Sequence, residues 1–370
     1  MQKIRVLVVE DSLTVRKRLV EVLSADPQIE IVGEAEDGKR GIELCQQLRP
    51  NVVTLDMMLP VMSGLAATEF IMAYCPTPIL VVSASTNRGE LFKTYEALAA
   101  GALDVLDKPR GNEVDDVWEQ RLVATVKLIS RIKVITHLRA RLSPMGQAPH
   151  ALAPRDGARP ALTTDGVAPS PREGHLRAVA IGVSTGGPAA LLELLRGLPH
   201  GFPLPILLVM HIGKLFAPAF AEWLDGQTPV RVRYAADGDA LPAVGEGRVL
   251  MASPDMHLVL REGKLRLTND PERHSCRPSV DVLFASLAQE LGAACAACLL
   301  TGMGKDGAEG LLAIRRAGGS TIAQDEATSV VFGMPREAIL LGAAEQVLPL
   351  DKIAPALAAL ALGANRGRRA

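Results

Sequence analysis

The feature that most constrains the fold is an alternation between short apolar runs and amphipathic segments. Runs of four to six residues rich in Val, Ile and Leu are typical of buried strands, and the segments between them have helical periodicity. Such an alternation predicts a parallel sheet with helices on both faces. In the first part of the chain the predicted strands are residues 4–9, 29–34, 52–55, 79–83 and 105–106, with helices such as 13–23 and 41–48 between them.

The same alternation resumes after residue 177. The predicted strands there are residues 178–181, 206–210, 248–251, 296–300 and 320–323. A hairpin interrupts them, with strands 258–260 and 265–267 joined by a turn at Glu262-Gly263. We therefore expect a second α/β domain that is doubly wound, mostly parallel, and carries one β-hairpin.

The segment between the two alternations has a different composition. Residues 143–174 hold six prolines and four glycines but no aromatic residue, so they bury too little apolar surface to offset the entropy of ordering. We interpret this segment as a flexible linker whose ends lie roughly 30 Å apart on average. The predicted division is 1–125 for the first domain, 126–175 for a connecting helix and linker, 176–362 for the second domain and 363–370 for a basic tail.

Composition excludes several classes of protein. The 40 basic and 41 acidic residues give a net charge of −1, so no global charge attracts nucleic acid or an anionic membrane. The sequence has no run of 18 apolar residues, so it predicts no membrane span. The first apolar stretch ends at once in Glu10-Asp11, which is not typical of a signal peptide. Five cysteines are too few for a secreted disulfide scaffold. We expect a cytoplasmic protein.

Charged and polar residues follow the predicted strands of the first domain. Glu10 and Asp11 follow the first strand and Asp56 follows the third, so three carboxylates meet at one rim of a parallel sheet. Crowded carboxylates repel one another unless a cation joins them, and oxygen ligands suit Mg²⁺. Ser83 and Lys108 offer a hydroxyl and an ammonium group to an anion at the same rim.

Four motifs in this order resemble a response-regulator receiver domain, which has a flavodoxin-like (βα)5 fold. They are Val8-Val9-Glu10-Asp11-Ser12, Leu55-Asp56-Met57-Met58-Leu59-Pro60, Val82-Ser83-Ala84 and Leu106-Asp107-Lys108-Pro109. The resemblance implies that Asp56 accepts a phosphoryl group, that Glu10, Asp11, Asp56 and the Met58 carbonyl hold Mg²⁺, and that Ser83 and Lys108 bind the phosphoryl oxygens. Two positions depart from the pattern: Glu10 stands where many receivers have Asp, and Val105 where many have an aromatic residue.

A glycine-rich turn opens the second domain. Ile181-Gly182-Val183-Ser184-Thr185-Gly186-Gly187-Pro188 leads from a predicted strand into a helix. Such a turn binds a phosphate at the helix N-terminus, presents a nucleophilic serine, or serves only as a turn. Neither the GxxxxGK[ST] nor the GxGxxG motif is present, which weakens the nucleotide interpretation without deciding between the other two.

Other strand ends favour the nucleophile. His211 closes the second strand of this domain and Asp306 follows the strand 296–300, so one rim can gather Ser184, His211 and Asp306 as a catalytic triad. Taken alone, His211 is as well explained as a core histidine, and His257 and His274 are rival bases in less favourable positions. Gly302 and Gly304 flank Met303 and let backbone N–H groups approach a substrate.

Cys295 and Cys298 have the spacing of a redox or zinc motif. They lie in a predicted buried strand, where residues three apart face opposite sides. A zinc site needs more ligands than one such pair, so we expect these cysteines only to pack.

The second domain resembles the chemotaxis protein-glutamate methylesterases (CheB). Besides the glycine-rich turn and His211, the matching motifs are Ser253-Pro254-Asp255, His257, Cys276-Arg277-Pro278-Ser279-Val280-Asp281, Leu300-Thr301-Gly302-Met303-Gly304-Lys305-Asp306-Gly307 and Val331-Phe332-Gly333-Met334-Pro335-Arg336. Met210 and Ile212 differ from the Gln and Met that often flank the family's histidine.

The resemblance implies Ser184 as nucleophile, His211 as base and Asp306 as the residue that orients it, with Thr185 and the Met303 backbone shaping the acyl site. It further implies a phosphorylation-activated esterase that removes glutamate γ-methyl esters from methyl-accepting chemoreceptors and deamidates particular receptor glutamines. A CheA-type histidine kinase would phosphorylate Asp56, and the receiver would cover the Ser184 rim until then. No cofactor is implied for the esterase reaction, and neither nucleic acid nor membrane insertion is expected.

Overall fold

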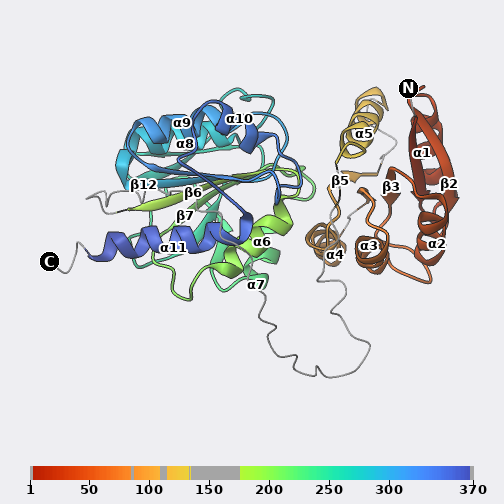
Figure 1. Ribbon diagram of the computed structural model, residues 1–370, viewed down its shortest axis with the longest axis horizontal. Coiled ribbons are helices and arrows are strands. Elements are labelled where there is room, and N and C mark those ends of the chain that lie inside the picture. The colour runs from red at the N-terminus through yellow and green to blue at the C-terminus, as the bar shows by residue number, and fades with distance from the viewer. Residues whose placement is uncertain (1–2, 85–86, 109–114, 133, 135–175, 367–370) are drawn as a thin grey trace, which may run out of the picture.

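The computed structural model describes residues 3–84, 87–108, 115–132, 134 and 176–366, which form two α/β domains (Figure 1). Most of the predicted linker, including all of residues 143–174, lies outside the described residues, as does the end of the predicted basic tail. None of the described helices is both long and apolar enough to cross a membrane.

The N-terminal domain is a five-stranded parallel sheet in the order β2-β1-β3-β4-β5, as predicted for a receiver. Its strands are β1 (Ile4–Val9), β2 (Ile29–Ala35), β3 (Val52–Leu55), β4 (Ile79–Ser83) and β5 (Asp104–Asp107). Its helices are α1 (Leu13–Ser24), α2 (Gly38–Leu48), α3 (Gly64–Tyr74), α4 (Arg88–Ala99) and α5 (Asp115–Ile129). Alternate strand residues enter opposite clusters: Val6 and Val8 pack with α1 and α5, whereas Leu7 and Val9 pack with α2, α3 and α4.

The C-terminal domain is built on a seven-stranded parallel sheet in the order β14-β13-β12-β6-β7-β9-β8. Its strands are β6 (Ala178–Val183), β7 (Ile206–Met210), β8 (Arg231–Tyr234), β9 (Arg248–Met251), β12 (Cys295–Leu299), β13 (Ser320–Gln324) and β14 (Gln346–Leu348). The predicted hairpin is confirmed as the antiparallel pair β10 (His257–Arg261) and β11 (Lys264–Thr268). The strand pattern missed β8 and β14, which lie at the two edges: β8 alternates arginine with partly buried residues, and β14 has only three residues.

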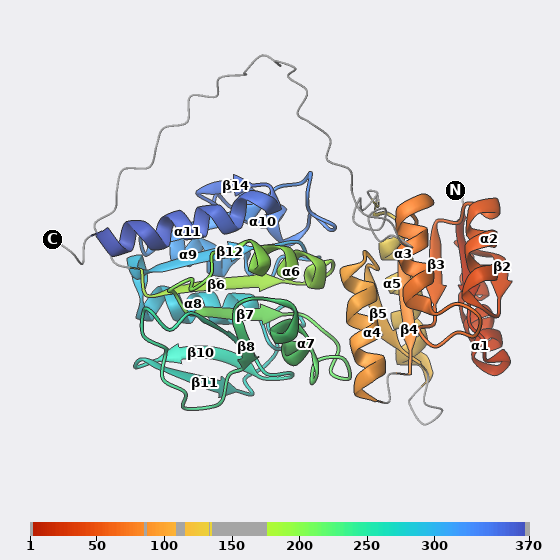
Figure 2. The ribbon, with the colours of Figure 1, turned by 90° about the horizontal axis from the view of Figure 1, so that it is seen from below.

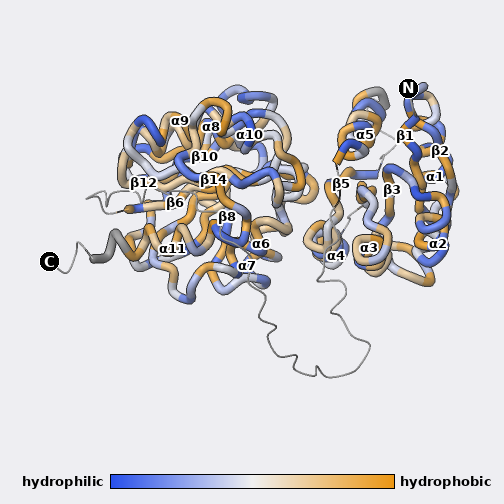
Figure 3. The backbone as a smooth tube through the Cα atoms, in the orientation of Figure 1, coloured by the Kyte–Doolittle hydropathy of each residue, from blue (hydrophilic) through white to orange (hydrophobic). Residues whose placement is uncertain are grey.

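Helices cover both faces of this sheet (Figure 1). They are α6 (Gly187–Gly197), α7 (Phe220–Gln227), α8 (Val280–Glu290), α9 (Ala308–Arg316), α10 (Met334–Leu340) and α11 (Leu350–Arg366), with a short 3-10 turn, η2 (Gly292–Ala294), after α8. The apolar course of β6 in Figure 3 matches its six buried residues. Cys295 and Cys298 are fully buried in different clusters, which confirms that they pack on opposite faces.

The two domains contact each other through α4, which faces α6 and α7 (Figure 2). Tyr95 of α4 is fully buried, and its hydroxyl donates a hydrogen bond to the carbonyl of Phe216. Its ring packs edge-on against Phe220, with centroids 5.3 Å apart, and lies 5.5 Å from Trp223. A receiver residue thus completes an aromatic cluster of the C-terminal domain.

Candidate active site and phosphoacceptor site

Ser184 follows β6 at the point where the chain turns into α6. Gly186 adopts the left-handed region with φ of 77°, and a Cβ there would lie 2.5 Å from Cβ of Val330, so both backbone and space require glycine. Pro188 occupies the first turn of α6, where its missing N–H costs no hydrogen bond. The turn holds Ser184 at the carboxyl edge of the sheet.

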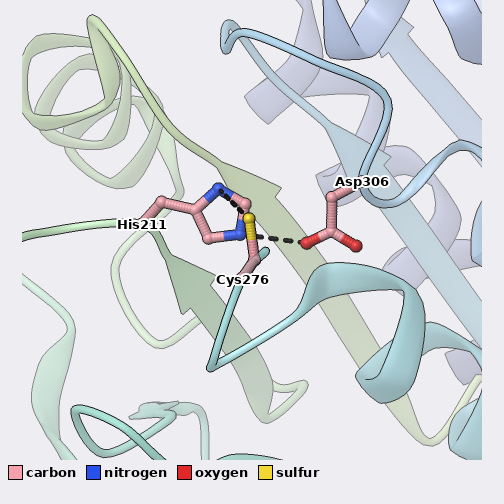
Figure 4. Close-up of side chains that lie close together, drawn as sticks. All are labelled: His211, Cys276 and Asp306. Carbon is pink, nitrogen blue, oxygen red and sulfur yellow. Dashed lines mark hydrogen bonds and ion pairs between the residues drawn. The ribbon is translucent and has the colours of Figure 1, made fainter. Parts of the chain in front are cut away.

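His211 follows β7, the neighbour of β6, and its backbone N–H donates to the carbonyl of Val183 over 3.0 Å. The half-buried imidazole lies between two groups, Asp306 and Cys276 (Figure 4). Its Nε2 is 3.0 Å from Oδ2 of Asp306, and its Nδ1 is 3.9 Å from Sγ of Cys276. The predicted His–Asp contact is therefore present.

Asp306 is a buried carboxylate with four partners. Its Oδ1 accepts from Ser279 Oγ at 2.7 Å and from the Asp281 N–H at 3.0 Å, while its Oδ2 accepts from the Val280 N–H at 2.7 Å besides His211. The two N–H groups belong to the N-terminus of α8, which favours negative charge. Burial raises the pKa of Asp306. The contact with His211 and these hydrogen bonds lower the pKa by more than burial raises it, so the pKa lies below its usual range.

Sequence reasoning missed the residues that hold Asp306. Ser279 caps α8 by accepting from the Val282 N–H, and a serine directly after Pro278 was a signal for that cap. Nothing local to the sequence indicated that the same helix end receives a carboxylate from the loop after β12.

The charge on Asp306 controls the protonation of His211. Burial alone would lower the pKa of His211, but the hydrogen bond to Asp306 and the nearby Cys276 outweigh it and raise the pKa to about 9. At neutral pH the imidazole is therefore mostly cationic.

Ser184 and His211 line one cleft of about 280 Å³, together with Thr185 and Cys276. Among the hydrogen bonds of the described residues, none joins Ser184 Oγ to His211. Asp306 occupies Nε2, so Nδ1 is the imidazole nitrogen left to exchange a proton with Ser184. The structure thus brings all three predicted residues to one rim but forms only the histidine–carboxylate half of their hydrogen-bonded chain.

The receiver supplies the other wall of this cleft. Leu98, Leu103, Val105 and Arg121 line it opposite Ser184. Val105, which departs from the receiver pattern, thus contributes to the cleft that Ser184 and His211 line. In this arrangement the receiver forms one wall of the cleft that Ser184 lines.

The rival histidines have other partners. His257 is fully buried, accepts from the Ser279 N–H at Nδ1 and donates to the Pro271 carbonyl from Nε2. His274 Nε2 lies 3.1 Å from Asp281 Oδ2. Neither lines the cleft, so both fit structural roles.

The loop after β12 packs directly against Ser184. The Thr301 carbonyl accepts from the Ser184 N–H at 3.0 Å, and a Cβ on Gly302 would lie 2.7 Å from Cβ of Ser184. Within the described chain, the N–H groups of Thr185 and Met303 donate to no backbone carbonyl. They remain available to an oxygen on a substrate.

The receiver rim gathers the predicted acidic residues. Lys108 Nζ lies 2.9 Å from carboxylate oxygens of both Glu10 and Asp56, and both carboxylates are buried. Oxygen atoms of Glu10, Asp11 and Asp56 lie within 4.8 Å of one another, an arrangement that fits a divalent cation. Burial and the charge of Asp56 raise the pKa of Glu10 to about 7, despite the opposing contact with Lys108.

The remaining predicted phosphate and metal ligands lie at the same edge. Ser83 is buried at the end of β4, and its carbonyl accepts from the Lys108 N–H at 3.2 Å. Met58 lies two residues beyond Asp56 in the loop after β3, with a half-exposed side chain.

Together, the fold and the two sites define a response regulator whose output domain is a doubly wound α/β unit with a serine, a histidine and a carboxylate at one rim. Response regulator receiver domains match residues 6–115, and CheB methylesterases match residues 179–357. The chain belongs to the CheB methylesterase family, which confirms the resemblance found in the sequence.

Relatives that match over nearly the whole chain agree with this membership. The chain is 44% identical over 354 residues to a protein-glutamate methylesterase/protein-glutamine glutaminase of Anaeromyxobacter dehalogenans, covering 96% of both chains. It is 42% identical over 372 residues to one of Pseudomonas aeruginosa, covering 99% of both. The CheB methylesterase catalytic domain of Thermotoga maritima is 37% identical and matches with a TM-score of 0.47, covering 51% of this chain and 100% of that one.

Proposed function

We propose that this chain is a cytoplasmic, phosphorylation-controlled serine esterase. Its substrates are glutamyl γ-methyl esters of methyl-accepting chemoreceptors, and it also deamidates particular receptor glutamines. The names of full-length relatives support the two reactions. The observation that carries the proposal is the meeting of Ser184, His211 and Asp306 at the ends of three adjacent strands, with the His211–Asp306 contact at 3.0 Å.

In the proposed acylation step, Ser184 Oγ attacks the ester carbonyl carbon while Nδ1 of neutral His211 takes the hydroxyl proton. The buried Asp306 holds Nε2 and stabilises the imidazolium that forms. Collapse of the tetrahedral intermediate breaks the ester C–O bond, and the departing methoxide takes the proton from His211 and leaves as methanol. Water, activated by His211, then releases the glutamate carboxylate and restores Ser184.

The oxyanion of that intermediate needs hydrogen-bond donors. We propose the N–H groups of Thr185 and Met303 as these donors. Both lie in loops beside Ser184, and neither donates to a backbone carbonyl of the described chain. A single donor of this kind typically contributes about 10²–10³ to the rate. The same donors serve a glutamine amide, where ammonia replaces methanol as the leaving group.

Control of the esterase is proposed to come from Asp56 of the receiver. A histidine kinase of the CheA type would supply the phosphoryl group, which Asp56 accepts as an aspartyl phosphate. Glu10, Asp11 and Asp56, with the Met58 carbonyl, would hold Mg²⁺, whose charge offsets that of the transferring phosphoryl group. Lys108 and Ser83 would bind the phosphoryl oxygens, and Lys108 would then leave its present contact with Asp56.

The decisive experiment measures methanol release from methylated receptor, with and without a small-molecule phosphodonor. We expect Asp56→Asn to keep the basal rate and to lose stimulation by the donor, because the amide cannot accept phosphate. Asp37→Asn, a change at the N-cap of α2 where an amide oxygen can still accept from the Arg40 N–H, is the matched control and should keep stimulation. Stimulation that persists in Asp56→Asn would show that another residue is the acceptor.

The esterase should become faster as the pH rises. Because Asp306 and Cys276 hold the pKa of His211 at about 9, the fraction of neutral base grows by about tenfold per pH unit below that value. We expect kcat/KM to rise from pH 6.5 and level off near pH 9; a plateau already reached at pH 7 would contradict this assignment. The raised pKa of His211 also contributes to the free energy of unfolding. This contribution is fully present below pH 6.5, the pKa of an ordinary histidine, and is lost as the pH rises through 9.

The docked receiver should restrain the esterase through Tyr95. Tyr95→Ala removes the ring from the Phe220–Trp223 cluster, so we expect basal methanol release without phosphodonor to rise by about 5- to 50-fold. Tyr74→Ala, at an exposed tyrosine on α3, is the control and should leave the basal rate unchanged. Both variants should still be phosphorylated at Asp56, which would show that their receivers are folded. An unchanged basal rate in Tyr95→Ala would contradict restraint of the esterase by the docked receiver.

A further inference from the structure

Cys276 is presented to the cleft by an unusual turn. Residues 273–276 are closed by paired backbone hydrogen bonds between Arg273 and Cys276, and His274 and Ser275 both adopt positive φ, at 52° and 59°. Two consecutive non-glycine residues in this region are strained, and such strain persists only where the surroundings impose it. Here Arg273 and His274 both contact the buried Asp281, which holds the turn in place.

This thiol differs from the other cysteines of the chain. Cys45, Cys75, Cys295 and Cys298 are buried, whereas Cys276 is partly exposed and lines the cleft beside Ser184. Its Sγ lies 3.9 Å from His211 Nδ1 and donates to the His274 carbonyl over 3.4 Å. The neighbouring backbone and histidine therefore fix the direction of the sulfur.

The three residues in Figure 4 form a cysteine–histidine–carboxylate arrangement inside the serine site. His211 is held by Asp306 on one nitrogen and faces sulfur with the other, the geometry in which a histidine assists a thiol nucleophile. A metal ion is a poorer occupant, although the ligand atoms of the three residues lie within 4.8 Å of one another. Asp306 already accepts four hydrogen bonds, and ligation would cost some of them.

We propose that Cys276 is a covalent modification site for small electrophiles, above all peroxides, and that its oxidation turns the esterase off. Nδ1 of His211 first takes the proton of the Cys276 thiol, and the sulfur then attacks one peroxide oxygen, so that an S–O bond forms as the O–O bond breaks. The hydroxide that leaves takes the proton from the His211 imidazolium and departs as water. Sulfur is oxidised to a sulfenic acid, the peroxide is reduced, and His211 is left neutral.

The loss of esterase activity rests on the proposed function and follows from the position of the sulfur. The sulfenic oxygen lies at the same imidazole nitrogen that Ser184 must use, and it occupies space in the cleft. Ser184 can then no longer pass its proton to His211. A thiol reductant should restore activity by returning the sulfur to the thiol.

The first test measures the thiol itself and needs no esterase activity. The reduced full-length protein is treated with iodoacetamide at pH 7 in the presence of glutathione, and label at each cysteine is quantified by peptide mass spectrometry. We expect Cys276 to react about tenfold faster than glutathione and the four buried cysteines more slowly, with His211→Gln removing the advantage of Cys276. A Cys276 in the unaltered protein that reacts no faster than glutathione would overturn the proposal.

The second test measures the consequence. Hydrogen peroxide should abolish methanol release by the unaltered protein, and dithiothreitol should restore it. Cys276→Ser should release methanol after peroxide at the same rate as its own untreated sample, whatever that rate is. Cys45→Ser is the matched control, because Cys45 is buried in the receiver, and it should remain sensitive. Equal inactivation of Cys276→Ser would refute the switch. A protein that releases no methanol before treatment would contradict the proposed function instead, while the alkylation rate would still decide the reactivity of Cys276.

Discussion

Ser184→Ala should lower methanol release from methylated receptor by about 10⁴-fold or more, because removal of the nucleophile leaves only substrate binding and the oxyanion donors. The variant should fold normally, since the Ser184 backbone contacts to Thr301 and Gly187 do not involve its side chain. Stopped assays of methanol release, with and without phosphodonor, measure the loss. The variant should still accept phosphate at Asp56, which shows that only the output reaction is gone.

Ser275→Ala is the matched control for this prediction. Ser275 lines the same cleft but lies in the turn before Cys276, away from the strand ends. Its rate should stay close to that of the unaltered protein. Comparable rates for Ser184→Ala and the unaltered protein would remove Ser184 from the reaction and favour a binding role for the glycine-rich turn.

Asp306→Asn should have the second-largest effect, a fall in kcat of about 10³–10⁴-fold. The amide keeps the shape of the side chain but cannot stabilise the imidazolium of His211, and its NH₂ group must face a hydrogen-bond donor among its four present partners. The unsatisfied contacts should lower the free energy of unfolding by about 2–4 kcal/mol. Denaturant titration and methanol release measure the two effects on the same preparation.

Asp281→Asn separates catalysis from stability. Asp281 is as buried as Asp306 and accepts from the Gly310 N–H at 2.6 Å, but its side chain contacts His274 and Arg273 rather than His211. We expect a loss of stability with a rate per folded molecule close to normal. If both variants lost activity in proportion to stability alone, Asp306 would be a structural carboxylate.

The fold could be predicted from the sequence because its signals are local. Buried strands of a parallel sheet are continuous apolar runs, and β1, β3, β4, β7 and β9 have the predicted bounds. The edge strands β8 and β14 were not predicted, because β8 carries exposed arginines and β14 has only three residues. An edge strand is identified by the neighbour it pairs with, and its own sequence carries little of that information.

The candidate sites could be predicted in part for the same reason. Residues in the segments that follow buried strands of one parallel sheet reach one edge, so Ser184, His211 and Asp306 could be grouped before any coordinates, as could Glu10 and Asp56. The hydrogen-bond partners of these residues could not be predicted from the sequence. Cys276 comes from a strained turn 65 positions away from His211, and no periodicity places it there.

The sequence by itself determined the two α/β units, the strand ends that carry chemistry and the membership of the CheB methylesterase family, because apolar periodicity and turn residues act over a few positions. Only the tertiary structure decided that the N-terminus of α8 holds Asp306, that the Cys276 thiol meets His211 and that the receiver forms a wall of the cleft beside Ser184. Tyr95 and Phe216 are 121 positions apart, and close packing of whole helices, rather than any local preference, brings such groups into contact.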